Sequence, residues 1–188
     1  FYALEQLVEA GVTDIGIITG DTAEQVQQAV GDGSRFGATV TYLPQPAPLG
    51  LAHAIITAEA WLGDSPFCMF LGDNFLGGGI APYARRFIEQ PCSSQILLRR
   101  VDDPSSLGVA VLDDCGRVER LVEKPREPVS NLAVIGVYFF GPEIHQITPH
   151  LTPSARGELE ITDAIQGLID AGFDVRAQTI ADDWIDTG

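Results

Sequence analysis

The feature that most constrains how this chain folds is a regular alternation of short apolar runs and helical segments through its first half. The apolar runs are rich in β-branched and aromatic residues, as buried parallel strands are, and lie at residues 14–19, 39–43 and 67–71. Segments with helical periodicity precede, separate and follow these runs, at residues 1–10, 23–30, 50–62 and 80–89. This alternation predicts a doubly wound α/β domain with a mostly parallel sheet.

The second half of the chain changes character and is dominated by strand patterns. Predicted strands lie at residues 95–101, 108–112, 118–123, 132–140 and 175–180, and one helix is predicted at residues 161–171. Turn residues such as Asp113 and Gly116 separate two of these strands. Because no internal repeat, low-complexity segment or linker interrupts the pattern, residues 1–188 are predicted to form a single domain with an added β-rich part.

The amino-acid composition restricts the kinds of molecule that the protein is expected to bind. The net charge is −15, and a nucleic-acid or anionic-membrane partner would need clustered Lys and Arg, so both are excluded as expected partners. A small anionic substrate fits, because Mg²⁺, backbone N–H groups and one or two cations can hold it. No apolar run approaches the roughly 20 residues of a membrane helix, and no signal peptide is seen. The three scattered cysteines favour a cytoplasmic protein with reduced thiols.

Carboxylates at predicted strand ends are the candidate metal ligands. In an open α/β sheet, ligands bind beyond the carboxyl ends of the strands, and Asp73 directly follows the predicted strand at residues 67–71. A carboxylate there suits Mg²⁺, while a turn or helix-cap aspartate is the alternative. Asp186, in the segment Trp-Ile-Asp-Thr-Gly near the end of the sequence, could share the cation if the two strand ends meet at one crevice.

A proline-stiffened segment, PQPAPLGLAHA at residues 44–54, follows a predicted strand and enters a helix. Gln45 carries an amide that can donate and accept hydrogen bonds, as reading a pyrimidine edge requires. Gly50 would let the backbone lie against a flat base. A rigid loop that only starts a helix is the alternative, and His53 is expected to be a packing or surface residue.

Two charged segments suggest a sugar-phosphate site. Glu123 and Lys124 close the predicted strand at residues 118–123; the lysine suits a phosphate and the glutamate could accept hydrogen bonds from sugar hydroxyls. A surface ion pair is the alternative. Arg156 and Glu158 precede the predicted helix at residues 161–171, where acids either favour the helix N-terminus or face the sugar.

Seven segments in the same order resemble the sugar nucleotidyltransferase family, and within it the long-form glucose-1-phosphate thymidylyltransferases. They span essentially the whole chain and read PQPAPLGLAHA, LGDN, LGVAVLD, VEKP, NLAVIGVYFF, RGELEITDAI and WIDTG. The resemblance implies a Rossmann-like nucleotidyltransferase fold with an added β-rich sugar-binding part. It implies Mg²⁺ as cofactor, dTTP and glucose 1-phosphate as substrates, and dTDP-glucose and pyrophosphate as products.

The resemblance also implies roles for particular residues. The nucleotide contacts would be Gln45, Pro48, Gly50 and Asp73. The sugar-phosphate contacts would be Gly108, Glu123, Lys124, Asn131, Ile135 within residues 134–136, Arg156 and Glu158. The metal ligands would be Asp73 and Asp186, which together with Lys124 form the expected catalytic set.

The chain departs from the family at its start. Members open with a strand and a glycine-rich loop, G-x-G-T-R-x-x-P, that cradles the triphosphate, and no segment here resembles that loop. Long-form members also continue beyond the position of Gly188. We therefore expect the sequence to be a piece of a longer protein that lacks the first strand and phosphate loop, and to be inactive alone.

The expected reaction is an in-line attack of the sugar phosphate on the α-phosphorus of the nucleotide, driven by positioning and charge neutralisation without a general base. The same chemistry with UTP and glucose 1-phosphate, or with GTP and mannose 1-phosphate, is an alternative. A non-catalytic subunit that binds nucleotide sugars is another, although Asp73, Lys124 and Asp186 favour an enzyme. A homo-oligomer is compatible with all of these readings.

Overall fold

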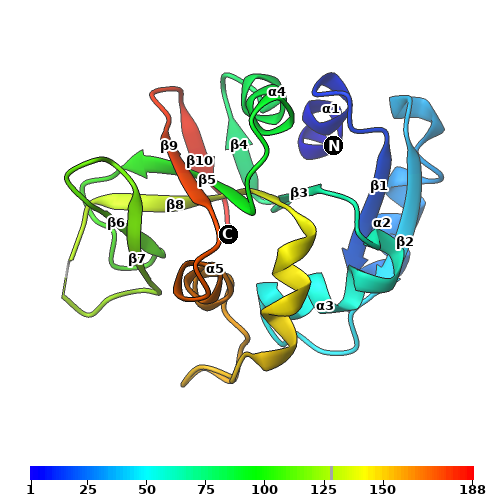
Figure 1. Cartoon of the computed structure of the whole chain (residues 1–188). Coiled ribbons are helices and arrows are strands. Elements are labelled where there is room, and N and C mark those ends of the chain that lie inside the picture. Colours follow the sequence, from blue (N-terminus) through cyan, green and yellow to red (C-terminus); the bar gives the residue numbers. More distant parts are fainter. Residues whose placement is uncertain (128) are drawn as a thin grey trace.

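The computed structural model describes residues 1–127 and 129–188 (Figure 1). The helices are α1 (Tyr2–Glu9), α2 (Ala23–Val30), α3 (Leu51–Leu62), α4 (Ala81–Glu89) and α5 (Ile161–Asp170), with short 3₁₀ turns η1 (Ser34–Phe36), η2 (Pro142–Gln146) and η3 (Thr148–His150). The strands are β1 (Asp14–Thr19), β2 (Thr39–Pro44), β3 (Phe67–Phe70), β4 (Asn74–Leu76), β5 (Ser94–Arg100), β6 (Val109–Leu112), β7 (Val118–Val122), β8 (Leu132–Phe140), β9 (Val175–Thr179) and β10 (Trp184–Asp186). Every predicted helix and strand is present, and no end differs from its predicted position by more than one residue.

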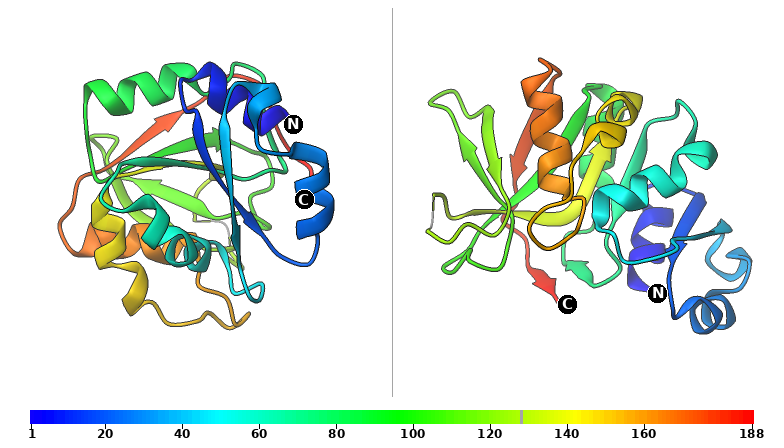
Figure 2. Two further views of the ribbon diagram at one scale, coloured as in Figure 1. Left: turned by 90° about the vertical axis from the view of Figure 1, so that its right-hand side faces the viewer. Right: turned by 90° about the horizontal axis from the view of Figure 1, so that it is seen from below.

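The strands form one large sheet and two small ones. The large sheet has the order β7-β6-β8-β5-β9, and β3 pairs with β8 as well. The pairs β1–β2 and β4–β10 stand apart as two-stranded sheets. The β1–β2 pair and the β6–β7 hairpin lie at opposite ends of the molecule (Figures 1 and 2). The α/β class is thus confirmed.

The strand directions differ from the expected mostly parallel sheet. The pairs β1–β2 and β5–β9 are parallel, whereas β3–β8, β5–β8, β6–β8, β6–β7 and β4–β10 are antiparallel, so the sheet is mixed. The reason lies in β8, which is apolar at every position and buried along its whole length. That pattern reports burial on both faces, which parallel strands share with central antiparallel ones, and it contains no information on direction.

Strand β8 separates two hydrophobic clusters, one on each face of the sheet. Alternate residues point to opposite faces, so Tyr138 and Phe140 pack in one cluster while Ile135 and Phe139 pack in the other. Helices α3 and α5 cover the first face and α1 and α4 the second, as Figure 1 shows below and above the sheet. Each such large apolar side chain stabilises the fold by about 1.5–3 kcal/mol on burial, and together they fix the position of β8.

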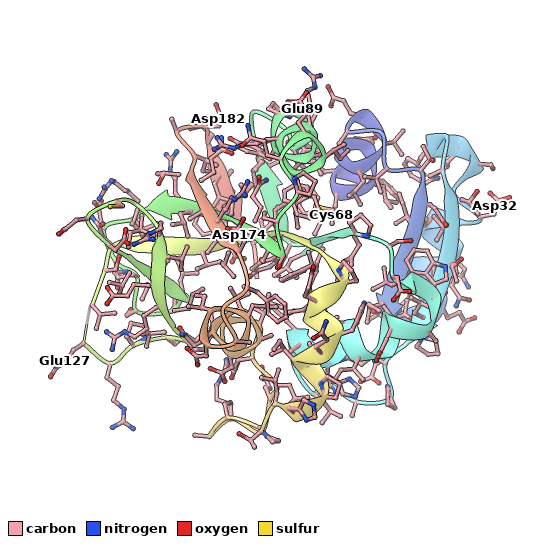
Figure 3. All side chains as sticks on the ribbon, viewed as in Figure 1. Asp32, Cys68, Glu89, Glu127, Asp174 and Asp182 are labelled. Atoms are coloured by element: carbon pink, nitrogen blue, oxygen red, sulfur yellow. The ribbon has the colours of Figure 1, made fainter. Side chains whose placement is uncertain are left out.

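Acidic side chains away from the sheet account for part of the net charge. Asp32, Glu89 and Glu127 project from the outer edges of the molecule (Figure 3). All three cysteines are free, and burial raises the pKa of the Cys68 thiol to about 12, so this group stays neutral. Among the described residues, no helix combines the length and apolar character that a membrane crossing needs.

Candidate active site

A cavity of about 210 Å³ opens where segments far apart in the sequence meet. Its walls come from the turn before β6, the end of β7, one face of β8, the segment before α5, and β10. The polar and charged lining residues are Asn74, Ser106, Glu123, Lys124, Arg156, Glu158, Glu160, Thr162 and Asp186. Five of the predicted site residues, together with the backbone of Gly108, therefore share one cavity.

Glu123 is held from two sides. Its Oε2 accepts a hydrogen bond of 3.0 Å from the Thr162 hydroxyl, and its Oε1 lies 3.4 Å from Nη2 of Arg156. Burial raises the pKa of the Glu123 carboxyl, and the Thr162 hydrogen bond and the neighbouring cations only partly oppose that rise. The site therefore holds a partly desolvated acceptor in a fixed orientation, which suits a neutral hydroxyl partner.

Arg156 is shared among three carboxylates. Its closest partner is Glu160, which accepts from Nη2 at 2.7 Å and from Nε at 3.2 Å, and Glu158 lies 3.4 Å away. The hydrogen bond to Glu160 raises the pKa of the guanidinium. Burial acts to raise the pKa of Glu160, but hydrogen bonds from Arg156 and from the Ser154 hydroxyl outweigh it, so that pKa is lowered. Glu160 is thus an ionised anchor for Arg156.

Lys124 occupies an unusual backbone position. Its φ of 38° lies in the left-handed region, which costs a non-glycine residue about 1–2 kcal/mol. The Lys124 N–H donates to the Leu107 carbonyl at 3.2 Å, and Nζ lies 4.0 Å from Glu123 Oε1. Strain of this kind is found at functional sites, where the surrounding structure holds it. Here it orients a half-exposed ammonium beside the cavity.

Gly108 faces Glu123 across the cavity wall. A Cβ at this position would lie 2.7 Å from Cγ2 of Thr162 and 3.1 Å from Oε2 of Glu123. Only glycine leaves space for these two side chains to meet, and its backbone is exposed to the cavity. The close approach agrees with the predicted backbone contact.

Asp73 and Asp186 converge although 113 positions separate them in the sequence. The strands β4 and β10 pair so that Asp186 is opposite Asn74, and Thr187 donates its N–H and its hydroxyl to the Asp73 carbonyl at 3.0 and 2.9 Å. A Cβ built on Gly188 would lie 2.6 Å from Asp73 Oδ2 and 3.3 Å from Asp186 Oδ1, so both carboxylates face the same point. The convergence that the sequence left undecided is therefore present.

These two carboxylates have the chemistry of an open cation site. Both are exposed, and within residues 1–127 and 129–188 no group of three or more His, Cys, Asp or Glu side chains could hold a metal. Mg²⁺ commonly takes one or two carboxylates and completes its shell with water and substrate phosphates. The pair fits that cation and does not fit a closed structural metal site.

Asn74 connects this pair to the sheet, and the sequence patterns did not single it out as a ligand partner. Its buried amide accepts from the Gly136 N–H at 3.0 Å and from the Trp184 indole at 2.7 Å, and it donates to Asp73 Oδ1 at 2.9 Å. A Cβ on Gly136 would lie 2.6 Å from the Asn74 amide, so this glycine makes room for it. The amide orients Asp73 with Oδ2 free.

The proline-rich segment reaches the cavity through Leu51, the first residue of α3. Gly50 has φ 101°, and a Cβ there would lie 2.5 Å from the Leu159 carbonyl. Leu159 N–H donates to the Leu49 carbonyl at 2.7 Å, which ties the loop to the segment that contains Glu158. Gln45 is half-buried at the base of the loop, and its Nε2 contacts His53 Nδ1 at 3.0 Å. His53, expected to be a packing or surface residue, is half-buried and is a hydrogen-bond partner of Gln45.

Six predicted contacts do not line the cavity: Asp73, Gln45 and Gly50, described above, and three more. Asn131 is exposed, and its Oδ1 accepts from Arg100 at 3.0 Å. The Ile135 side chain is fully buried in the cluster under α1 and α4, on the face of β8 opposite the cavity; Val134 and Gly136 line the cavity instead. Pro48 is exposed at the tip of its loop. The placement of Ile135 excludes a side-chain contact with a ligand in the cavity, because alternate residues of a strand face opposite sides.

Thr162, Glu160 and Asn74 contact the predicted site residues but were not themselves assigned a role. Glu160 is the N-cap of α5 and Thr162 lies in its first turn, and at a helix end the periodicity does not indicate which side chains turn toward a neighbouring strand. Asn74 directly follows Asp73, which was the available signal; it is the first residue of β4.

The fold and the site together define an α/β protein with a cavity in which cations lie beside two carboxylates that face one point. The nucleotidyl transferase family model matches residues 1–188, and the chain belongs to this family.

Curated relatives and solved structures agree with this assignment. The chain is 54% identical over 189 residues to the glucose-1-phosphate thymidylyltransferase of Streptomyces antibioticus and 45% identical over 188 residues to the low-salt glycan biosynthesis nucleotidyltransferase Agl11 of Haloferax volcanii. It is covered completely in both matches but spans about half of these relatives, 53% of each. A crystal structure of UDP-glucose pyrophosphorylase complexed with UDP-glucose matches 98% of the chain and 79% of its own, with a TM-score of 0.87 at 26% identity. A Bacillus anthracis protein in complex with sucrose matches 98% of the chain and 75% of its own, with a TM-score of 0.90 at 35% identity.

Proposed function

We propose that the protein containing this chain transfers a thymidylyl group from dTTP to glucose 1-phosphate, giving dTDP-glucose and pyrophosphate. The observation that carries the proposal is the convergence of Asp73 and Asp186 beside a cavity that also holds Lys124 and Arg156. The names of relatives at 54% and 52% identity support the choice of substrates.

The cavity residues account for binding of the sugar phosphate. Lys124 and Arg156 supply positive charge for the phosphate, and Glu123 accepts a hydrogen bond from a sugar hydroxyl. Glu160 and Thr162 hold Arg156 and Glu123 in place before the substrate arrives. Such preorganisation lowers the entropy cost of reaching the reactive arrangement.

In the proposed reaction an oxygen of the sugar phosphate attacks the α-phosphorus of the nucleotide. A new P–O bond forms as the bond between the α-phosphorus and the bridging oxygen breaks, and pyrophosphate leaves with that oxygen. The attacking oxygen is already ionised near neutral pH, so no side chain needs to remove a proton. Positioning and charge neutralisation then supply the rate enhancement.

Asp73 and Asp186 are the residues that would hold Mg²⁺, through the two carboxylates that face one point. When bound, such a cation offsets the negative charge of the phosphates as it builds up during transfer. Asn74 leaves Asp73 Oδ2 free for this purpose by engaging Oδ1. We further propose a cytoplasmic location, which agrees with three free thiols.

The same residues would serve UTP as well as dTTP, and the high structural similarity to a UDP-glucose complex supports UTP as the second candidate nucleotide. Pyrophosphate release by the full natural polypeptide, measured with dTTP, UTP and GTP against glucose 1-phosphate and mannose 1-phosphate, tests the proposal. We expect the highest kcat/KM with dTTP and glucose 1-phosphate. Binding of nucleotide sugars without pyrophosphate release under any of these conditions would contradict it and indicate a non-catalytic binding protein.

A further inference from the structure

The side-chain amide of Gln45 makes both of its protein contacts through one atom. Nε2 lies 3.2 Å from the Gly50 carbonyl oxygen and 3.0 Å from His53 Nδ1. The Gly50 oxygen has only lone pairs, so the amide atom that faces it must be the one that carries hydrogens. The hydrogen-bond chemistry of this contact therefore fixes which amide atom is Nε2 and which is Oε1.

The second contact requires His53 to accept. The Thr57 hydroxyl has one hydrogen, and it donates this hydrogen to the His53 carbonyl at 2.9 Å. The same hydroxyl oxygen lies 3.4 Å from His53 Nδ1 but has no hydrogen left to donate to it. Nδ1 therefore presents its lone pair to the Gln45 amide, and the imidazole carries its hydrogen on Nε2. Both hydrogens of the Gln45 Nε2 group are then committed to the protein.

We infer that His53 is a specificity-positioning residue that makes Gln45 an acceptor-only reader of the nucleotide base; the inference rests on the proposed function. Within residues 1–127 and 129–188, no donor contacts Gln45 Oε1. Thymine and uracil carry one donor on their pairing edge, N3–H, which matches this oxygen. Cytosine has a lone pair at N3, and two facing acceptors leave a polar group unpaired.

The surroundings of the amide are rigid enough to maintain this arrangement. Gly50 and His53 lie at the start of α3, and the loop is tied to Leu159 by the hydrogen bonds from Leu159 N–H to the Leu49 carbonyl and from Ala52 N–H to the Leu159 carbonyl, of 2.7 and 3.0 Å. The Gly50 carbonyl would keep the amide orientation even without the imidazole. Loss of His53 alone would therefore free one N–H of Gln45, so that the amide offers a donor as well as an acceptor.

Two substitutions at position 53 separate this role from packing. His53→Leu removes the acceptor and keeps the bulk, whereas in His53→Asn the Oδ1 atom takes nearly the place of Nδ1 and can accept. In the full natural polypeptide, we expect His53→Leu to reduce the preference for dTTP over dCTP by about 3- to 10-fold, as loss of one neutral hydrogen bond implies. His53→Asn should restore most of the preference.

Isothermal titration of dTTP and dCTP, together with kcat/KM for both, provides the measurement. The change should appear in nucleotide Kd and KM, while kcat and the KM for glucose 1-phosphate stay near wild type. Gln45→Leu should remove the preference, and adding His53→Leu to it should have no further effect. The matched control is His150→Leu, at an exposed histidine far from the loop in sequence, with no expected change.

The outcomes separate the inference from the proposed function. A folded His53→Leu protein whose preference for dTTP over dCTP, measured by Kd and kcat/KM, equals that of wild type would overturn the inference alone. A wild-type protein that binds dCTP as tightly as dTTP would do the same. Preference for UTP over dTTP would overturn the proposed substrate and support the inference, because uracil presents the same N3–H. Wild-type protein that binds no nucleotide would overturn both.

Discussion

Two groups of carboxylates line the site, and they are stabilised in different ways. Asp73 and Asp186 are exposed, and among residues 1–127 and 129–188 neither forms an ion pair; backbone and amide hydrogen bonds fix their position. Glu123, Glu158 and Glu160 share Arg156 as a common cation. Within the described residues the first group has no protein cation as a partner, whereas the negative charge of the second group is partly offset by Arg156 and Lys124.

This difference separates two functions of an acidic side chain. A pair of carboxylates without a protein cation has the chemistry to bind a divalent ion, which is the role proposed above for Asp73 and Asp186. Glu123, Glu158 and Glu160 instead have Arg156 as a protein cation between them, and they serve to position the guanidinium and to accept hydrogen bonds. The net charge of −15 therefore does not oppose phosphate binding, because the local arrangement decides the sign of the field.

The strongest test of the comparison removes one charge from the pair of Asp73 and Asp186. Asp73→Asn keeps the shape and its carbonyl contacts with Thr187 but loses a cation ligand. We expect turnover at saturating Mg²⁺ to fall by about 10³-fold, because cation stabilisation of the transition state is worth several kcal/mol. The melting temperature should change little. Asp114→Asn, on an exposed turn, is the matched control, and wild-type turnover in Asp73→Asn would exclude the metal role.

Removal of the Lys124 ammonium, which lies beside Glu123, should give the next largest effect. Lys124→Ala is expected to lower kcat/KM for glucose 1-phosphate by about 10- to 100-fold, the range for a lost charge-assisted hydrogen bond, with the nucleotide KM little changed. Lys124→Gly should show the same kinetic loss and a higher stability than Lys124→Ala, because glycine relieves the backbone at φ 38°. An unchanged dependence on sugar-phosphate concentration would contradict the assignment.

A smaller effect is expected on stability when the anchor of Arg156 is neutralised. Glu160→Gln should lower the free energy of unfolding at pH 7 by about 1–2 kcal/mol, a value reduced for the exposure of Arg156. Because the pKa of Glu160 is lowered on folding, its contribution is complete above the unfolded value near 4.5 and is lost as pH falls through the folded value. Urea unfolding of both proteins should therefore converge below pH 4.5, and a constant difference would exclude the ionic role.

Glu123→Gln should give the smallest change and the opposite sign. The pKa of Glu123 is raised on folding, chiefly by burial, so its stabilising contribution is present at low pH and is lost as pH rises through the folded value. At pH 7 the substitution should leave the free energy of unfolding unchanged or raise it by less than about 1 kcal/mol. A loss of unfolding free energy as large as that of Glu160→Gln, measured in the same urea series, would show that Glu123 stabilises the fold through its charge, as Glu160 does.

Much of this protein could be predicted from local sequence patterns. The order of helices and strands follows from the apolar periodicity, and Asp73 could be located because it lies just after the apolar strand β3. Lys124 could be proposed from its charge at a strand end. The side chain of Ile135 was placed wrongly, although its neighbours Val134 and Gly136 line the cavity, because the choice between alternate faces of a strand depends on the phase of β8 against the helices that cover it.

The sequence by itself determined the helices and the longer strands and indicated several of the side chains that line the cavity, since periodicity and residue type act locally. Tertiary structure alone decided that β8 pairs antiparallel with β3 and β5, that the three-residue strands β4 and β10 bring Asp186 to Asp73, and that His53 reaches Gln45. Strand direction and pairing partner depend on contacts between residues far apart in the chain. Such contacts leave no periodic pattern in a short stretch of sequence, and a strand of three residues, such as β4 or β10, is too short to show one of its own.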